Sequence, residues 1–265
     1  MRARSGAAFW AVVLIALGAI FLLRNLRILD IDGGAIFALF LIGLGAWLLL
    51  GNLVRRGGAG ALSRSVPLEG AREARLEVNH GAGDLRIGPS SDPAALVTST
   101  ANAEIISSVR RAGDRLDVRL REDRDWWFWM WPGNWGGPHH WSLAINRDVP
   151  VSLAVRTGAS NAAIDLHDLK VTALSVEVGA SSVDVTLPAS GQVSARIKAG
   201  AADVKVRVPQ GVAARVRGAV GAGTLNFDNA RFPYMGGVHQ SPDYETASSR
   251  VDLSIEGGAA AVRVM

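Results

Sequence analysis

Histidine and aspartate side chains can hold a metal ion or transfer protons, and both stand at positions of this 265-residue chain that could suggest such a site. The five histidines show no H-E-x-x-H spacing, and the adjacent pair His139 and His140 is weak support for a metal site. Asp84 and Asp203 stand at equivalent repeat positions near glycine turns, as acids do in calcium-binding β-rolls. The other equivalent positions hold uncharged residues, which are Asn161, Ser182 and Thr224. We therefore expect turn-forming aspartates and no metal site.

The motifs of nucleophilic catalysis and phosphate binding are missing as well. No G-x-S-x-G elbow occurs, and the chain has no cysteine, so thiol chemistry and disulfides are excluded. The Gly-rich run at 218–223 precedes an alternating, strand-like pattern, whereas a phosphate-binding loop leads into a helix. The sequence therefore predicts a protein without catalytic residues, metal or cofactor.

A tryptophan-rich insert at 125–141 contains six of the eight tryptophans of the chain. Three interpretations remain open. The rings could pack over the solenoid described below, lie in the headgroup layer of a membrane, or form a stacking platform for a carbohydrate or peptide. The candidate contact residues of this insert are Trp126, Trp127, Trp129, Trp131 and Trp135.

Four basic residues, Arg196, Lys198, Arg215 and Arg217, occupy polar positions of an internal repeat. Arg196 and Arg217 are one repeat apart, so we expect them on adjacent coils, about 5 Å from each other. Like charges at that spacing need a counter-charge. Either acids from neighbouring turns supply it, or an anionic lipid or an acidic partner surface does. The net charge of +4 is too small to predict nucleic-acid binding.

The repeat has a period of 21 residues and is marked by Gly-Ala at Gly158, Gly179, Gly200 and Gly221. Each repeat contains two stretches in which apolar and polar residues alternate, which is typical of half-buried strands. Two short strands and two turns fit one repeat, so the sequence predicts an all-β solenoid of stacked coils. Its inward side chains include Val185, Ile197 and Val206, and its outward side chains include Asp184, Lys198 and Lys205.

The first 54 residues are nearly all apolar and predict a two-helix transmembrane hairpin, with helices at about 6–23 and 33–54. A cleaved signal peptide is the alternative for the first run, but no small-residue cleavage site precedes Arg24. Flanking arginines place both chain ends, and hence the solenoid, in the cytoplasm. We expect a flexible linker at 55–65 and the solenoid domain at 66–265.

Two sets of motifs resemble known bacterial families. The runs Leu14-Ile15-Ala16-Leu17-Gly18 and Leu41-Ile42-Gly43-Leu44-Gly45 resemble the transmembrane region of LiaI and LiaF-type proteins. The chain from Val66 onward resembles the toast-rack domain, through Trp141-Ser142-Leu143, Thr157-Gly158-Ala159-Ser160 and the closing Gly-Gly-Ala-Ala-Ala-Val-Arg-Val. LiaF-type members inhibit a histidine kinase that senses cell-envelope stress caused by cell-wall-active antibiotics.

The resemblance implies a non-enzymatic scaffold or regulator in envelope-stress signalling, anchored in the bacterial plasma membrane by two helices. Its candidate partner is a sensor histidine kinase or another membrane protein. The alternative is a surface-exposed, adhesin-like or glycan-binding module, with the tryptophan-rich insert as its contact site.

Overall fold

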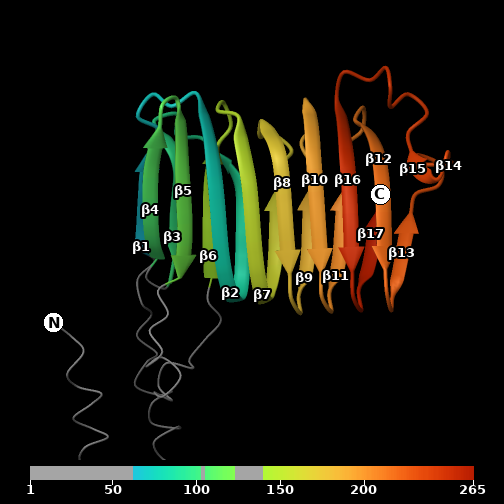
Figure 1. The fold of residues 1–265 in the computed structure, drawn as a ribbon. Coiled ribbons are helices and arrows are strands. Elements are labelled where there is room, and N and C mark those ends of the chain that lie inside the picture. Colours follow the sequence, from blue (N-terminus) through green and yellow to red (C-terminus); the bar gives the residue numbers. More distant parts are fainter. Residues whose placement is uncertain (1–61, 103–104, 123–139) are drawn as a thin grey trace, which may run out of the picture. The chain divides into compact units, whose positions relative to one another are not determined.

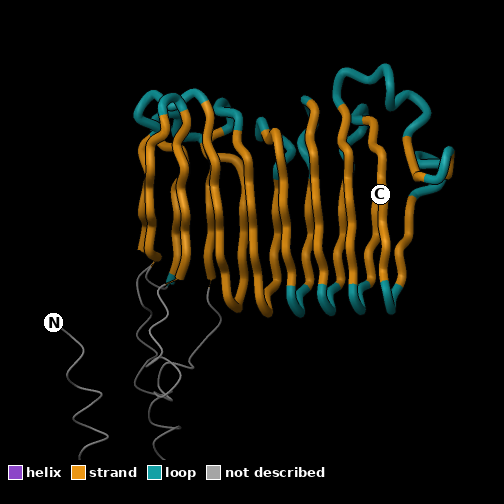
Figure 2. Tube along the Cα trace, viewed as in Figure 1, coloured by secondary structure: helices purple, strands orange, loops and turns teal. Residues whose placement is uncertain are grey.

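The computed structural model describes residues 62–102, 105–122 and 140–265, and these fold into seventeen strands without a helix (Figure 2). None of these residues belongs to an apolar helix that could cross a membrane. The strands are β1 (Leu62–Pro67), β2 (Glu73–Ser90), β3 (Ala95–Ala101), β4 (Ile105–Ala112), β5 (Arg115–Glu122), β6 (His140–Asn146), β7 (Val151–Asp165), β8 (Val171–Val178), β9 (Ser182–Thr186), β10 (Gln192–Ala199), β11 (Asp203–Arg207), β12 (Ala213–Val220), β13 (Thr224–Phe227), β14 (Tyr234–Met235), β15 (Val238–Gln240), β16 (Arg250–Gly257) and β17 (Ala261–Val264).

The strands form two facing layers that are joined at sharp corners (Figure 1). In the first layer the neighbours are β4, β5, the first half of β2, the first half of β7, β8, β10, β16, β12 and β15. In the second layer they are β1, β3, β6, the second half of β2, the second half of β7, β9, β11, β17 and β13. The pairs that β2 forms with β5, β6 and β7, and all pairs from β7 through β8–β11 and β16–β17 to β12 and β13, are parallel. The described part is therefore a β-solenoid-like stack of coils.

The apolar core lies between the two layers and follows from the alternation of the sequence. The predicted inward residues Val185, Ile197 and Val206 have no exposed surface, which confirms the predicted strand faces. Lys198 is exposed as predicted, whereas Asp184 and Lys205, which were also predicted to be exposed, are half-buried. Burial of these branched side chains on both layers is the main stabilising contribution of the fold.

The glycine of each Gly-Ala pair lies at the corner between the layers, where consecutive coils approach most closely. A Cβ atom on Gly158 would stand 2.4 Å from the carbonyl oxygen of Gly81, and one on Gly179 would stand 2.7 Å from that of Gly158. A Cβ atom on Gly200 would likewise stand 2.8 Å from the carbonyl oxygen of Gly179. Every larger residue would force these backbones apart, which explains why glycine recurs with the period of the repeat.

The last strands of the chain lie inside the stack and not at its end. β16 pairs with β10 on one side and β12 on the other, and β17 lies between β11 and β13 in the same way. We call β16–β17 the inserted coil and β12–β13 the end coil. The repeat predicted that the end coil would follow β10–β11 directly, and this prediction is wrong: a loop at 228–249 brings the chain back to fill that place (Figure 1).

The two ends of the stack are closed differently. At the N-terminal end, β1, β3 and β4 pair antiparallel, and β1 begins at Leu62, inside the segment 55–65 that was expected to be a linker. At the other end, β13 pairs with β17 alone among the strands described, and its Leu225 and Phe227 are half-buried. The predicted hairpin, the linker up to residue 61 and the insert up to residue 139 lie outside the described residues.

Candidate functional site

A row of alternating charges crosses four neighbouring strands on the outer surface of the first layer. Arg156 on β7, Glu177 on β8, Lys198 on β10 and Glu256 on β16 are direct cross-strand neighbours in that order. We call these four residues the charge row. It ends on an uncharged residue at both sides, which is Asn79 on β2 and Ala219 on β12.

Ion pairs connect the side chains of this row. Arg156 Nε lies 3.0 Å from Glu177 Oε2, and its Nη1 lies 2.8 Å from Oε1 of Glu77 on β2. Lys198 Nζ lies 3.4 Å from Glu256 Oε2. All four side chains of the row are about half exposed, so each pair stabilises the fold by only about 0.2–1 kcal/mol. The charges are thus ordered by their strands and remain accessible.

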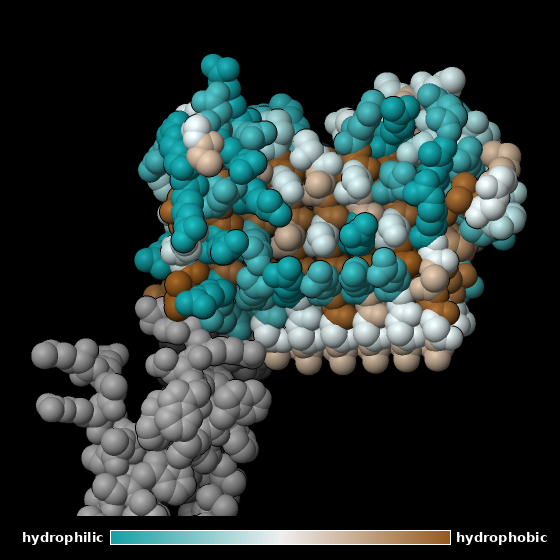
Figure 3. Space-filling model, viewed as in Figure 1, coloured by the Kyte–Doolittle hydropathy of each residue, from teal (hydrophilic) through white to brown (hydrophobic). Residues whose placement is uncertain are grey.

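A groove of about 680 Å³ runs beside the charge row along the glycine corners. The four charged residues border it, and backbone of Gly179, Gly200, Gly221 and Gly258 lines it. Figure 3 shows the band of polar side chains across the layer and, along the edge where the strands turn, a pale band of small residues. The groove is shallow because the coil contacts exclude side chains from the corners.

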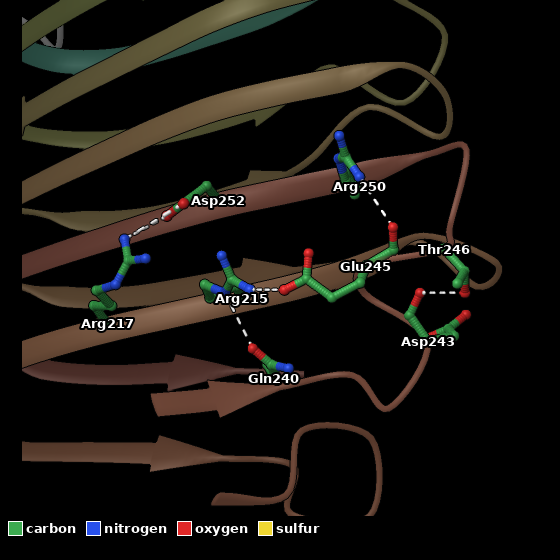
Figure 4. Close-up of polar contacts among 8 residues, drawn as sticks. All are labelled: Arg215, Arg217, Gln240, Asp243, Glu245, Thr246, Arg250 and Asp252. Carbon is green, nitrogen blue, oxygen red and sulfur yellow. Dashed lines mark hydrogen bonds and ion pairs between the residues drawn. The ribbon is translucent and has the colours of Figure 1, made fainter. Parts of the chain in front are cut away.

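The predicted basic patch is interrupted by acids from the inserted coil and its loop (Figure 4). Arg217 Nη1 lies 3.0 Å from Asp252 Oδ1. Arg215 donates from Nε to Gln240 Oε1 at 3.0 Å and forms an ion pair with Glu245. The expected adjacency of Arg196 and Arg217 is wrong, because Ser254 of β16 stands between them. The inserted coil therefore separates the like charges of Arg196 and Arg217, and it supplies Asp252 as the counter-charge of Arg217.

Arg196 differs from the other three predicted basic residues. Lys198, Arg215 and Arg217 each have an acidic partner. Within the described part of the chain, no ion pair or hydrogen bond of the Arg196 side chain is found. Arg196 is exposed between Ser175 and Ser254. Contact of these basic residues with a lipid or an acidic partner stays a prediction, and Arg196 is the residue best placed for it.

The five candidate tryptophans of the insert, Trp126, Trp127, Trp129, Trp131 and Trp135, lie outside the described residues. Trp141, at the end of the same insert, belongs to β6 and is 2% exposed. Its indole Nε1 donates to Ser99 Oγ at 2.8 Å. Trp141 is therefore a core side chain of the stack, and the three interpretations of the other tryptophans of the insert stay predictions.

A buried polar pair lies close to Trp141 and was not predicted from the sequence. His80 Nδ1 is 2.5 Å from Glu122 Oε1, and the His80 ring lies 5.8 Å from the Trp141 ring, centre to centre. Both side chains of the pair are nearly inaccessible to solvent. The pair joins the middle of β2 to the last residue of β5 and stabilises the corner of the first coils.

Tyr244, in the loop at 228–249, has a shifted pKa. Burial raises the pKa of its hydroxyl above 10.0, and the charge of Asp252 raises it further. Arg215 opposes this shift from its position over the ring, at 4.2 Å from the ring centre. Two consecutive loop residues thus contact Arg215: the Tyr244 ring packs against it, and Glu245 forms an ion pair with it.

Within residues 62–102, 105–122 and 140–265, no three histidines or acids gather in a way that could hold a metal ion. Of the charge row, sequence analysis singled out Lys198 and missed Arg156, Glu177 and Glu256, and it also missed Glu245 and Asp252. Their signal was present, since Asp252 and Glu256 are the outward residues of an alternating stretch. Their partners could not be assigned, however, because the repeat gives no reason to place that stretch between two earlier coils.

Comparison with known proteins gives a family and a fold. A family model described as the N-terminal domain of toast_rack, DUF2154, matches residues 59–207. A solved structure of a candidate cell adhesion protein from Clostridium sporogenes ATCC 15579 covers 77% of this chain and 97% of its own, with a TM-score of 0.62 and 17% identity. The match to a candidate adhesin from Bacteroides fragilis NCTC 9343 covers 77% of this chain and 97% of that one at 7% identity, but its TM-score of 0.19 is too low to indicate a shared fold. No curated protein matches the chain significantly.

Proposed function

The chain belongs to the toast-rack family, and from this premise we propose that it is a non-enzymatic scaffold or regulator anchored in a bacterial plasma membrane. In this proposal the apolar runs at 6–23 and 33–54 form the anchoring hairpin. The stacked coils then stand at the cytoplasmic surface of the membrane, where other membrane proteins can reach them.

The observation that carries this proposal is the charge row on its rigid support. Its four side chains are spaced by strand pairing, each directly follows a core residue that is at most 1% exposed, and each stays about half exposed. Such a surface is flat and wide, whereas a small substrate needs a concave site with converging polar groups. An ordered, accessible row of charges is suited to recognise another macromolecule.

The signalling role rests on the resemblance of the N-terminal runs to LiaI and LiaF-type proteins. In that setting the partner is a sensor histidine kinase, or another membrane protein of the envelope-stress response. The charge row would contribute specificity by rejecting surfaces with an unmatched charge pattern.

A crosslinking experiment tests the proposal in cells that carry the native gene. The full chain is tagged and crosslinked in its membrane, and a reporter of the response to cell-wall-active antibiotics is followed with and without the gene. We expect a histidine kinase among the crosslinked proteins and a changed reporter output. An unchanged reporter together with no crosslinked kinase contradicts the proposal.

The second candidate function is adhesion or glycan binding at the cell surface. It is supported by the tryptophan-rich insert and by the fold likeness to a protein described as a candidate for cell adhesion. Because the chain lacks cysteine, a single Ser194→Cys variant at an exposed position reports the side of the membrane by labelling with an impermeant thiol reagent in intact cells. Labelling of intact cells, with saturable glycan binding that Trp129→Ala abolishes, favours adhesion. Labelling only after lysis favours the scaffold.

A further inference from the structure

The charge row reads positive, negative, positive, negative from Arg156 to Glu256, with an uncharged neighbour at each end. An alternating row with an even number of members becomes its own complement when it is reversed. Intramolecular pairing needs only that adjacent charges differ in sign, and it requires neither an even number nor uncharged ends. The even number of charges and the uncharged ends are the two properties that favour contact with a reversed copy of the same row.

We propose that the charge row is a docking surface for a second copy of this chain, related to the first by a two-fold axis. The axis runs parallel to the strands and passes between β8 and β10. Arg156 then faces Glu256 of the second copy, and Glu177 faces Lys198 of the second copy. The two remaining contacts follow by symmetry, so every charge of the row meets an opposite charge.

The alternation also determines the alignment of the two copies. A displacement by one strand brings Glu177 onto Glu177 of the second copy and Arg156 onto Lys198 of the second copy. Three of the four charges would then face a like charge, while Glu256 would face the uncharged Asn79 of the second copy. Such juxtaposition of like charges is strongly unfavourable at an interface. The row therefore selects one alignment and rejects its nearest alternatives.

The neighbouring rows agree with this alignment in most positions. In the next row, Glu77 on β2 faces Arg217 of the second copy, and Ser175 faces Arg196 of the second copy, which has no partner within the described part of its own chain. A like-charge contact arises twice in the row beyond, between Arg75 and Arg215 of the second copy and again by symmetry. It lies where Glu245 already pairs with Arg215, so the repulsion is reduced.

The glycine groove permits the close approach that this contact needs. The corners beside the row carry backbone and alanine methyl groups instead of long side chains, so the two surfaces can meet without displacing flexible groups. The axis also keeps the strands of both copies pointing in the same direction. Leu62, which lies level with Leu85 near the Gly81 corner, is then at the same end of both copies. This is compatible with two chains anchored in one membrane.

Each charge of the row already has an intramolecular partner, so the interface gains most from specificity and less from affinity. Association should therefore weaken as the salt concentration rises, because exposed charges are screened. A second copy would occupy the same charge row that the proposed function gives to a membrane-protein partner, so the two contacts exclude each other. Self-association is tested on the purified chain alone, so its failure is distinguishable from failure of the signalling role.

Charge reversal in the full chain tests the docking surface. Lys198→Glu makes the row positive, negative, negative, negative, and Glu177→Lys makes it positive, positive, positive, negative. Either variant with itself contains two like-charge contacts, so we expect self-association to fall at least about tenfold relative to the wild type. A mixture of the two variants restores all four opposite contacts. We expect the mixed dimer to form as well as the wild-type dimer and in preference to either variant dimer.

The measurement is native mass spectrometry of the full chain in detergent micelles, with tags of different mass on the two variants. If the chain dimerised through another surface, mixed and unmixed dimers would form equally well. Any loss of stability caused by a charge reversal is present in mixed and unmixed dimers alike, so it cannot favour the mixed dimer. Thermal unfolding of each variant checks that the fold is retained. A monomeric wild-type chain, or random mixing of the two variants, overturns the proposal.

Discussion

The stack from β1 to β11 and the stack from β12 to β17 follow different rules. Between β7 and β11, neighbours in sequence are neighbours in space, and each coil lies on the coil before it. After Arg207, where the family match also ends, the order in space becomes inserted coil and then end coil. The repeat thus specifies the shape of a coil, whereas its position in the stack is decided by which strands pair.

The difference has an electrostatic consequence. Direct stacking of the end coil on β10–β11 would place Arg217 beside Arg196, as the repeat period requires. The inserted coil instead places Ser254 between them and brings Asp252 to Arg217 and Glu256 to Lys198. Direct stacking would place like charges side by side, whereas the inserted coil places opposite charges side by side. Electrostatics therefore favour the inserted coil over direct stacking.

The largest expected effect compares a buried valine of the regular stack with its neighbour in the inserted coil. Val206 on β11 and Val264 on β17 are paired, and both are at most 1% exposed. Replacing either with Asp buries an unpaired charge, so we expect each variant to lose more than about 4 kcal/mol of unfolding free energy. Circular dichroism of the two variants provides the measurement. A Val264→Asp variant that melts like the wild type would show that β17 is a peripheral end strand.

A smaller effect distinguishes the inserted coil from the end coil. Leu253 on β16 is fully buried, whereas Leu225 on β13 is half-buried. We expect Leu253→Ala to cost about 2–5 kcal/mol, and Leu225→Ala to cost about half as much or less, because the open end leaves little cavity. Chemical denaturation of both variants measures this difference. Equal costs would mean that the end coil is covered as fully as the interior.

The glycine corners give a third, matched comparison. A Cβ atom on Gly179 would stand 2.7 Å from a backbone oxygen, whereas one on Gly221 in the end coil would stand 3.4 Å from its nearest neighbour. We expect Gly179→Ala to cost about 1–3 kcal/mol and Gly221→Ala to change stability by less than about 0.5 kcal/mol. The two midpoints of thermal unfolding measure this. Identical midpoints would contradict the close approach of the central coils.

The pH dependence of stability tests the loop that returns the chain to the stack. Because burial raises the pKa of Tyr244 above 10.0, the folded state holds this proton at a pH where the unfolded state has lost it. Its stabilising contribution is complete below pH 10.0 and is lost as the pH rises through the folded-state pKa. We expect Tyr244→Phe to unfold with a weaker dependence on pH above that value. An unchanged pH profile would place the hydroxyl in solvent.

The smallest effect concerns the two arginines that the repeat placed together. Removing Arg217 breaks an exposed ion pair with Asp252, so Arg217→Ala should cost about 0.5 kcal/mol, and Arg196→Ala should change stability very little. For binding to a membrane we expect the opposite order, with Arg196 contributing more than Arg217. Cosedimentation of a 59–265 fragment with anionic vesicles should fall by up to about fivefold for Arg196→Glu and less for Arg217→Glu, with both effects lost at high salt. Equal binding by both variants and the wild type would leave Arg196 as surface charge.

The strand faces of the candidate site followed from the sequence, whereas of the charge row only Lys198 was singled out and its partner was not. Lys198 was correctly assigned to an exposed position, and Ile197 to the core, because period two depends only on adjacent residues. The partner Glu256 is distant in the chain, and the alternation of its strand gave no information about its neighbours. His80 could not be found either, since a buried histidine with an acidic partner has no spacing motif.

The sequence by itself determined the all-β class, the two-strand coil, the buried faces and the glycine at every corner. These features depend on local chemistry, which is the alternation of apolar residues and the absence of a Cβ atom at close backbone contacts. Only the tertiary structure decided the order of the coils and the partners of the charges. Any alternating strand pair of this length fits between two coils, because parallel backbone pairing is the same for every sequence. The choice among such pairs depends on the reach of the loop at 228–249 and on the match of outward charges, and both are properties of the assembled stack.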